Sequence, residues 1–315
     1  MWSAARIRRS VSSLSKLAPT QTVPASGGVI RDDRTDQSYL DLGASAVYAS
    51  VGRIDTNSWM GTGTLIAPDW VLTAGHVVNG IKSLNFTIGG MVYSAKQWIQ
   101  NPNWTSVLSF GYDIAVVQLT KAVANIKPAE RYYGSAELGK TATFVGFGTT
   151  GNGLTGASRF DGRKRAGQNI YDKISAGNGA AGRDLLYDFD NPAQAADNVI
   201  GASTPLNLEY LIATGDSGGG GFINVDGRDF LAGVHSYGSA VDGVYNSDYG
   251  DYAADVRVSA FNSWIDSILG VSDTPLNIVM PSVNFETASV NAVPEPASWC
   301  GLAMAGILAS RRRNR

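Results

Sequence analysis

The sequence is poor in the residues that build metal centres and disulfide scaffolds. Its 315 residues include one cysteine, Cys300, and two histidines, His76 and His235. A single cysteine cannot form a disulfide within the chain, and structural zinc sites use four Cys or His ligands. The sequence therefore excludes a disulfide-stapled scaffold and a cysteine-rich zinc site, and it disfavours a centre built from several histidines. We expect neither a metal nor a cofactor.

Charged residues are also few, at 17% of the chain, and they are unevenly distributed. Residues 1–28 carry four basic side chains and no acid, and residues 294–315 carry four basic side chains and one acid, so the middle of the chain is acidic. A protein that grips nucleic acid needs a basic face, and we expect no nucleic-acid partner. Hydrophobic residues make up 44% of the chain, which suits a globular protein with a sizeable core.

The apolar stretch near the C-terminus is too short for a comfortable membrane anchor. It covers residues 299–309, which as a helix would span roughly 16 Å, about half of a bilayer core. Pro294-Glu295-Pro296 precedes it, and an arginine-rich end follows it. This three-part order in residues 294–315 resembles the PEP-CTERM sorting signal of Gram-negative bacteria. The resemblance implies export to the cell envelope or the extracellular space, processing by an exosortase-type transpeptidase, and transient membrane contact through residues 299–309.

Residues 1–28 match an export signal only in part. They carry the basic start that such a signal needs, and Arg8-Arg9 is similar to a twin-arginine motif. The stretch from Val11 to Leu17 is too polar for the apolar region that normally follows. We assign residues 1–28 to an N-terminal export or pro segment outside the fold.

Between these ends, short apolar runs alternate with turn residues, which is typical of an all-β protein. A helical pattern appears only near the end, where apolar residues between Phe261 and Leu269 fall on one face and Gly270 is placed to end the helix. The polar run 127–139 predicts a crossover between two halves, and residues 271–293 read as a linker. The apolar runs predict strands at residues 44–51, 63–66, 70–73, 84–88, 114–119, 141–147, 221–225 and 230–234.

Three segments place reactive side chains in distinctive local contexts. His76 follows a predicted strand and a short turn. Asp113 stands at the start of the apolar run 114–119, where a carboxylate is costly unless it has a partner. Ser217 lies in the glycine-rich segment 215–219, whose backbone can adopt positive φ. Each of these residues alone has a structural explanation, as a hydrogen-bonded histidine, a capping aspartate or a turn serine.

Together the three residue types fit nucleophilic catalysis. A serine hydroxyl is a poor nucleophile at neutral pH and needs an adjacent base, for which histidine has a suitable pKa. A buried carboxylate on the other ring nitrogen fixes the tautomer and stabilises the imidazolium. Backbone N–H groups of Gly215 and Ser217 are candidates for the oxyanion hole, where losing one donor typically costs about 10²–10³ in rate.

The order His, Asp, Ser with these contexts resembles the trypsin/chymotrypsin-like serine protease family. The resemblance covers roughly residues 40–270 and implies a protease domain at residues 29–270. It implies two six-stranded antiparallel β-barrels with a C-terminal helix, and peptide hydrolysis with His76 as base, Asp113 as its orienting group and Ser217 as nucleophile. The motifs that carry it are Leu72–His76, Asp113–Ala115, Gly215–Gly219, Val234–Gly238 and Arg257–Ile265.

The same resemblance suggests how a protein or peptide substrate binds. Leu211 takes the position at the base of the specificity pocket and Thr214 lies beside it, so the acid that selects Arg or Lys in trypsin is absent there. Ser236-Tyr237-Gly238 would be the edge strand that pairs with the substrate backbone. His235 stands where glutamate-specific relatives carry a pocket histidine, although a histidine hydrogen-bonded in the barrel wall is the favoured interpretation.

Two further features stay open at this stage. No clear activation site precedes the domain, with Gly28-Val29-Ile30 as the nearest candidate, so Asp216 either pairs with a new N-terminal amine or finds another partner. The acidic run Asp188-Phe189-Asp190-Asn191 fits Ca²⁺ binding or, better, a solvated loop, because no complete ligand pattern is present.

Two alternative functions compete with the protease. One is a catalytically silent protease fold that serves as a surface or matrix binding protein, against which the complete set of His76, Asp113 and Ser217 argues. The other is an esterase, which the sequence does not support because the Gly-x-Ser-x-Gly elbow and the α/β pattern are missing.

Overall fold

The computed structural model describes residues 23–24, 28–175, 182–201 and 203–271. The predicted sorting tail, the linker from residue 272 onward and nearly all of the N-terminal segment lie outside these residues. The structure therefore does not test the predictions made for the residues outside these ranges.

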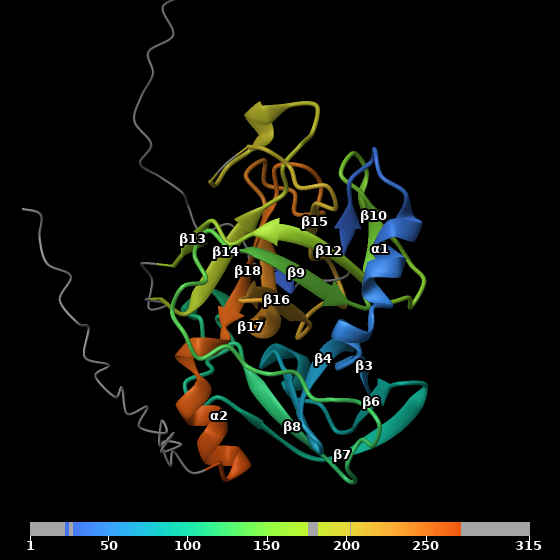
Figure 1. Cartoon of the computed structure of the whole chain (residues 1–315), viewed down its shortest axis with the longest axis vertical. Coiled ribbons are helices and arrows are strands. Elements are labelled where there is room, and N and C mark those ends of the chain that lie inside the picture. The colour runs from blue at the N-terminus through green and yellow to red at the C-terminus, as the bar shows by residue number, and fades with distance from the viewer. Residues whose placement is uncertain (1–22, 25–27, 176–181, 202, 272–315) are drawn as a thin grey trace, which may run out of the picture. The chain divides into compact units, whose positions relative to one another are not determined.

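The first half of the fold is a closed barrel of six antiparallel strands (Figure 1). The strands neighbour one another in the order β3-β4-β5-β8-β7-β6. Apolar side chains such as Leu65, Val71, Phe86 and Val116 are fully buried inside it. β-branched and aromatic residues favour this pleated, half-buried surface. The strands are β3 (Val51–Thr56), β4 (Met60–Ala67), β5 (Trp70–Thr73), β6 (Leu84–Ile88), β7 (Met91–Gln100) and β8 (Ala115–Leu119).

The second half is a larger sheet in the order β12-β9-β16-β17-β18-β14-β13, which forms a half-barrel and does not close. A short strand, β1 (Val23–Pro24), pairs with β17 beside this path, so these two residues join the fold, contrary to the expectation that residues 1–28 lie outside it. The two-barrel fold expected from the resemblance is therefore present, with one barrel closed and the other open. The strands are β9 (Thr141–Gly146), β12 (Arg165–Ile170), β13 (Lys173–Ile174), β14 (Asp184–Asp188), β16 (Gly220–Val225), β17 (Arg228–Ser239) and β18 (Tyr252–Arg257).

A small four-stranded sheet holds the beginning of the domain in place. Its order is β11 (Gly156–Phe160), β10 (Thr149–Asn152), β2 (Val29–Ile30) and β15 (Tyr210–Leu211). β2 pairs in parallel with β10 and antiparallel with β15. Val29 is fully buried there, so the chain that follows Gly28 is an inner strand of this sheet.

The C-terminal helix matches its prediction closely. Helix α2 spans Asn262–Leu269, buries Ile265, and ends at Gly270, whose φ of +69° is left-handed backbone that glycine adopts without strain. Residues 127–139 connect β8 to β9, so they run from the closed barrel to the half-barrel.

The strand expected at residues 44–51 is wrong. Helix α1 (Asp36–Gly43) and the short 3₁₀ helix η1 (Ala46–Tyr48) occupy this region, and β3 begins only at Val51. The N–H groups of Ala44 and Ser45 donate to the carbonyls of Leu40 and Leu42. They are therefore used in local turns and cannot join a sheet ladder, and alanine and serine have little intrinsic preference for strands.

Candidate active site

His76 begins a short 3₁₀ helix, η2 (His76–Val78), just after β5 ends. Its Nδ1 lies 2.7 Å from Oδ2 of Asp113, and its backbone N–H donates to Oδ1 of the same carboxylate at 2.7 Å. The carboxylate thus fixes both the ring and the backbone of His76. Nδ1 carries the proton in such a contact, so Nε2 is left as the basic nitrogen.

Asp113 lies just before β8 and is fully buried. A buried carboxylate is tolerated when hydrogen-bond donors surround it. Besides the two donors of His76, the hydroxyl of Ser236 in β17 donates to Oδ2 of Asp113 at 2.5 Å. This contact joins the half-barrel to the closed barrel through the carboxylate. The sequence predicts Ser236 only as part of the substrate edge, and its hydroxyl contact with Asp113 is an additional finding.

Ser217 lies in the turn between β15 and β16, and hydrogen bonds tie this turn to both halves of the fold. The carbonyl of Ser217 accepts the N–H of Thr62 in β4 at 2.8 Å, and the Thr62 hydroxyl donates to the carbonyl of Gly215 at 2.7 Å. On the other side, the N–H of Gly218 donates to the carbonyl of His235 in β17 at 2.8 Å. The turn is therefore held at the junction of the two halves.

Close packing at glycines brings the Ser217 turn next to the His76 segment. A Cβ on Gly218, whose φ is +81°, would lie 2.0 Å from Oγ1 of Thr73 and 2.9 Å from the nitrogen of Ala74. A Cβ on Gly61 would lie 3.1 Å from Val77 and 3.2 Å from the carbonyl oxygen of Ser217. The structure thus gathers the three expected residues at one place, and His76 Nε2 is buried there without a hydrogen-bond partner among the described residues.

Asp216 finds its partners inside the fold. Its carboxylate is buried and accepts the N–H groups of Gly148 at 3.2 Å and Ala213 at 3.3 Å, together with the hydroxyl of Tyr210 at 3.3 Å. Burial raises the pKa of Asp216 above its ordinary value. A Cβ on Gly146 would lie 1.9 Å from Oδ1, so only glycine permits this close approach. Tyr210 was not singled out from the sequence, although it directly precedes Leu211.

The residues expected to bind substrate lie around the same turn. Leu211 is buried in β15, and Thr214 leads into the turn, where its carbonyl accepts the N–H of Thr149 at 2.8 Å. Tyr237 and Gly238 pair with β18 on one side of β17. On their other side β16 has already ended its pairing at Val234, and β1 occupies that edge with Val23 opposite Gly238 and Pro24 opposite Tyr237.

His235 belongs to a fully buried polar cluster. Its Nδ1 lies 2.8 Å from Oδ1 of Asp255, and Asp255 also accepts the hydroxyls of Tyr171 at 2.7 Å and Tyr187 at 3.0 Å. The ring stands edge-on to Phe144. These contacts favour a structural role of His235 over glutamate binding, because the side chains of both His235 and Asp255 are fully buried.

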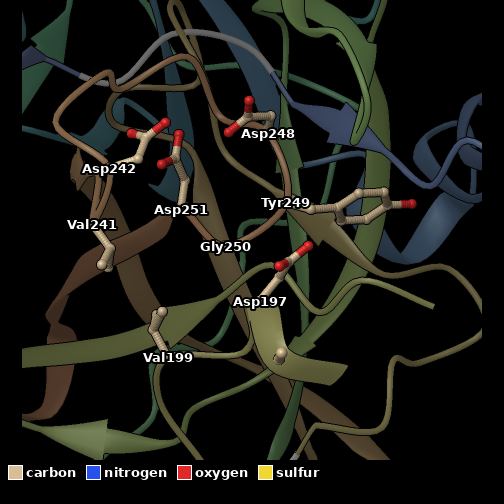
Figure 2. Close-up of a pocket in the computed structure, with 9 residues that line it drawn as sticks. Asp197, Val199, Val241, Asp242, Asp248, Tyr249, Gly250 and Asp251 are labelled. Atoms are coloured by element: carbon tan, nitrogen blue, oxygen red, sulfur yellow. The ribbon is translucent and has the colours of Figure 1, made fainter. Parts of the chain in front are cut away.

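An acidic recess of about 370 Å³ lies beside the loop that follows β17 (Figure 2). Its acidic side chains come from two segments, and Asp197, Asp242, Asp248 and Asp251 are labelled in the figure. They serve in part as local braces: Asp251 accepts the N–H groups of Asn246 at 3.1 Å and Ser247 at 2.8 Å. The hydrogen bonds of Asp251 therefore help to fix the conformation of the loop 241–251.

The acidic run at residues 188–191 is also used internally. Asp188 accepts the N–H groups of Val199 at 2.6 Å and Ile200 at 2.8 Å, and both Asp188 and Asp190 are buried rather than solvated as expected. Within the part of the chain that the structure describes, no group of three or more His, Cys, Asp or Glu side chains is arranged to hold a metal ion.

A family model described as Trypsin matches residues 43–265, well over half of the chain. The chain belongs to the trypsin family. A chymotrypsin of Phaedon cochleariae is 24% identical over 230 residues, which cover 67% of this chain and 72% of that protein. These likenesses support a serine protease function for this trypsin-family chain.

A solved structure of HL collagenase has a similar fold, with a TM-score of 0.54 and 18% sequence identity. The match covers 72% of this chain and 96% of that chain. At this level of identity the likeness concerns the fold alone. Among the described helices of this trypsin-family protein, none is both long and apolar enough to cross a membrane.

Proposed function

We propose that this protein is a serine endopeptidase that hydrolyses peptide bonds through an acyl-enzyme on Ser217. The observation that carries the proposal is the pair of 2.7 Å contacts that fix the His76 ring and backbone on the buried Asp113 carboxylate. A histidine held in this way offers Nε2 as a base of fixed orientation. Because His76 lies beside the Ser217 turn, the Ser217 hydroxyl is the nucleophile that this base would activate.

The reaction follows from these roles. The Ser217 Oγ attacks the carbonyl carbon of the scissile bond while its proton passes to His76 Nε2, and Asp113 stabilises the imidazolium. The resulting N–H on Nε2 then protonates the leaving amine, which breaks the C–N bond and leaves an ester on Ser217. Water attacks this ester, again with Nε2 as base, and the proton returns to Oγ as the carboxylic acid product leaves.

The backbone around Ser217 is suited to stabilising the oxyanion. Gly215 has a φ of +102°, a region that favours glycine, and its carbonyl is held by the Thr62 hydroxyl. We assign the N–H groups of Gly215 and Ser217 as the oxyanion donors. The substrate backbone would pair with Tyr237 and Gly238 on the edge beyond the β16 pairing, in place of β1.

The direct test is hydrolysis of a peptide library by the full chain, with Ser217→Ala and His76→Ala as paired variants. We expect wild-type cleavage at defined bonds and a fall of at least about 10³ in kcat for either variant, because the triad residues act as a unit. A folded wild-type protein that cleaves no peptide would instead support the silent binding protein. Similar rates for all three proteins would show that the hydrolysis is not catalysed at this site.

We also propose that the protein is exported and sorted to the cell envelope or the extracellular space of a Gram-negative bacterium. The support is the order of the Pro294-Glu295-Pro296 motif, the apolar stretch 299–309 and the arginine-rich end. An exosortase-type enzyme would be the partner of this tail, and the membrane contact would be transient because the stretch is short. In a host with such an enzyme, deletion of residues 294–315 should abolish the loss of mass that accompanies processing. A full chain that keeps its calculated mass and is found in the same fractions as the shortened chain would refute the proposal.

A further inference from the structure

The loop between β17 and β18 places a tyrosine against the segment that precedes Ser217. Tyr245 is half-buried, and its hydroxyl donates to the backbone carbonyl of Ile212 at 3.0 Å. Ile212 follows Leu211, the expected base of the specificity pocket, and both side chains are fully buried. The Tyr245 hydroxyl therefore lies at the bottom of the pocket that would receive a substrate side chain beside Ser217.

The ring of Tyr245 also covers the opposite side of this region. A Cβ on Gly238 in β17 would lie 2.0 Å from Cζ and 2.1 Å from the hydroxyl oxygen of Tyr245. Such distances mean that the ring packs directly on the backbone of Gly238. Gly238 belongs to the edge strand that pairs with substrate, so the ring spans the space between the edge strand and the segment 211–213.

Several hydrogen bonds fix Tyr245 in this position. The hydroxyl of Ser247 lies 3.0 Å from both the Ile212 carbonyl and the Tyr245 hydroxyl. Asp251 accepts the backbone N–H groups of Asn246 and Ser247, the two residues that follow Tyr245. Asp251, which lines the acidic recess in Figure 2, thus holds the loop that carries Tyr245. A bulky substrate group can displace a side chain held at its tip and through its backbone only at the cost of these hydrogen bonds.

We propose that Tyr245 sets the substrate specificity by filling the pocket for the residue before the scissile bond, the P1 residue. The proposal rests on the proposed protease function and names its substrate class: peptides with a small P1 side chain such as Ala. Leu or Phe at P1 would have to displace the ring, and a charged P1 group would have to be buried against the apolar wall of Leu211 and Ile212.

The test measures kcat/KM of the full chain on peptides that differ only at P1, with Ala, Leu, Phe, Lys or Glu. We expect Ala to exceed each of the others by at least about tenfold, the scale on which pockets discriminate by size. Tyr245→Ala should raise the Phe-to-Ala ratio by at least about tenfold, because it opens a pocket with apolar walls. Tyr245→Phe keeps the ring and loses the hydroxyl, and it should retain the preference for Ala.

The outcomes separate this inference from the proposed function. A wild-type protein that cleaves peptides and prefers Phe, Leu, Lys or Glu at P1 would overturn the role of Tyr245 and leave the protease function standing. The same holds if Tyr245→Ala is folded and active with an unchanged P1 profile. If Tyr245→Ala does not fold, the wild-type profile and the Tyr245→Phe variant still decide the matter. A folded wild-type protein without any peptidase activity would overturn both proposals.

Discussion

The hydroxyl of Tyr210 lies 3.3 Å from Oδ2 of Asp216, the residue immediately before Ser217. Asp216 is buried, and its other partners are the backbone N–H groups of Gly148 and Ala213. Gly28, the last residue of the N-terminal segment, is close by, since a Cβ on it would lie 1.7 Å from the Tyr210 hydroxyl oxygen. Among the described residues, a phenol therefore takes part in anchoring the carboxylate that fixes the Ser217 turn.

This contact predicts the effect of Tyr210→Phe. Removing the hydroxyl leaves Asp216 with one donor fewer, and the turn that carries Gly215 and Ser217 is then less firmly held. We expect kcat to fall about three- to tenfold with little change in KM, on the scale of about 1 kcal/mol for one hydrogen bond. Tyr39→Phe is a matched control, because Tyr39 stacks on Tyr210 and donates to the Glu209 carbonyl without contacting Asp216. Equal kcat values for the two variants at similar melting temperatures would contradict the assignment.

Ser236→Ala tests the contact that joins β17 to the triad carboxylate. Loss of the hydroxyl removes one of the three hydrogen bonds that Asp113 accepts from Ser236 and His76. Since hydrogen bonds to charged groups contribute about 1.5–3 kcal/mol, kcat/KM should fall by roughly one to two orders of magnitude. Ser239→Ala in the same strand serves as a control for general effects on β17. A Ser236→Ala variant with wild-type kcat/KM would show that the contact has no part in orienting His76.

Asp184 predicts a pH-dependent change in stability. Burial, together with the nearby charge of Asp113, raises the pKa of Asp184 to about 7. The folded state thus holds this proton more tightly than the unfolded chain, and stability is lost as pH rises from about 4 through about 7. Asp184→Asn removes the ionisation, so its melting temperature relative to wild type should be several degrees higher at pH 8 than at pH 5.

The control for this experiment is Asp226→Asn. Asp226 is exposed and has a φ of +51°, a conformation that Asn also tolerates, so its substitution should give the same offset at both pH values. If the offset of Asp184→Asn is also independent of pH, the carboxyl does not titrate between folded and unfolded states as described.

The pairing of β1 with β17 predicts a competition with substrate. Val23 and Pro24 lie opposite Gly238 and Tyr237, on the edge where a peptide would pair. A chain that lacks residues 1–24 should therefore have a several-fold lower KM for peptides and an unchanged kcat, because an intramolecular competitor is lost. A chain that lacks residues 1–20 keeps β1 and should behave like the full chain. If all three chains have the same KM, β1 does not occupy the edge in solution.

The sequence predicted what depends on local pattern. The apolar runs of β5, β6 and β8, bounded by turn residues, located those strands to within a residue, and the spacing from Phe261 to Leu269 located α2. His76, Asp113 and Ser217 were recognisable because each stands in a distinctive local context. Whether they act as a triad was a prediction from family resemblance, and it stays a prediction for the experiments above.

Contacts between segments that are distant in the sequence could not be predicted from local patterns. Ser236 and Asp113 are 123 positions apart, and nothing in either local pattern indicates that the hydroxyl meets the carboxylate. Tyr245 lies in an irregular loop, where neither helical nor strand periodicity fixes the direction of a side chain. The open half-barrel likewise depends on strand pairing across the whole fold, and local strand propensity carries no information about closure.

The most direct measurement of the central claim is the labelling of the full chain by a fluorophosphonate, with the modified residue located by peptide mapping. The account predicts one label on Ser217, because only a serine beside a fixed base reacts readily, and loss of the label in Ser217→Ala. Asp113→Asn should label far more slowly, by about 10³–10⁴, since it leaves His76 in the wrong tautomer. A folded wild-type protein that takes no label, or one that is labelled at another residue, would contradict the account.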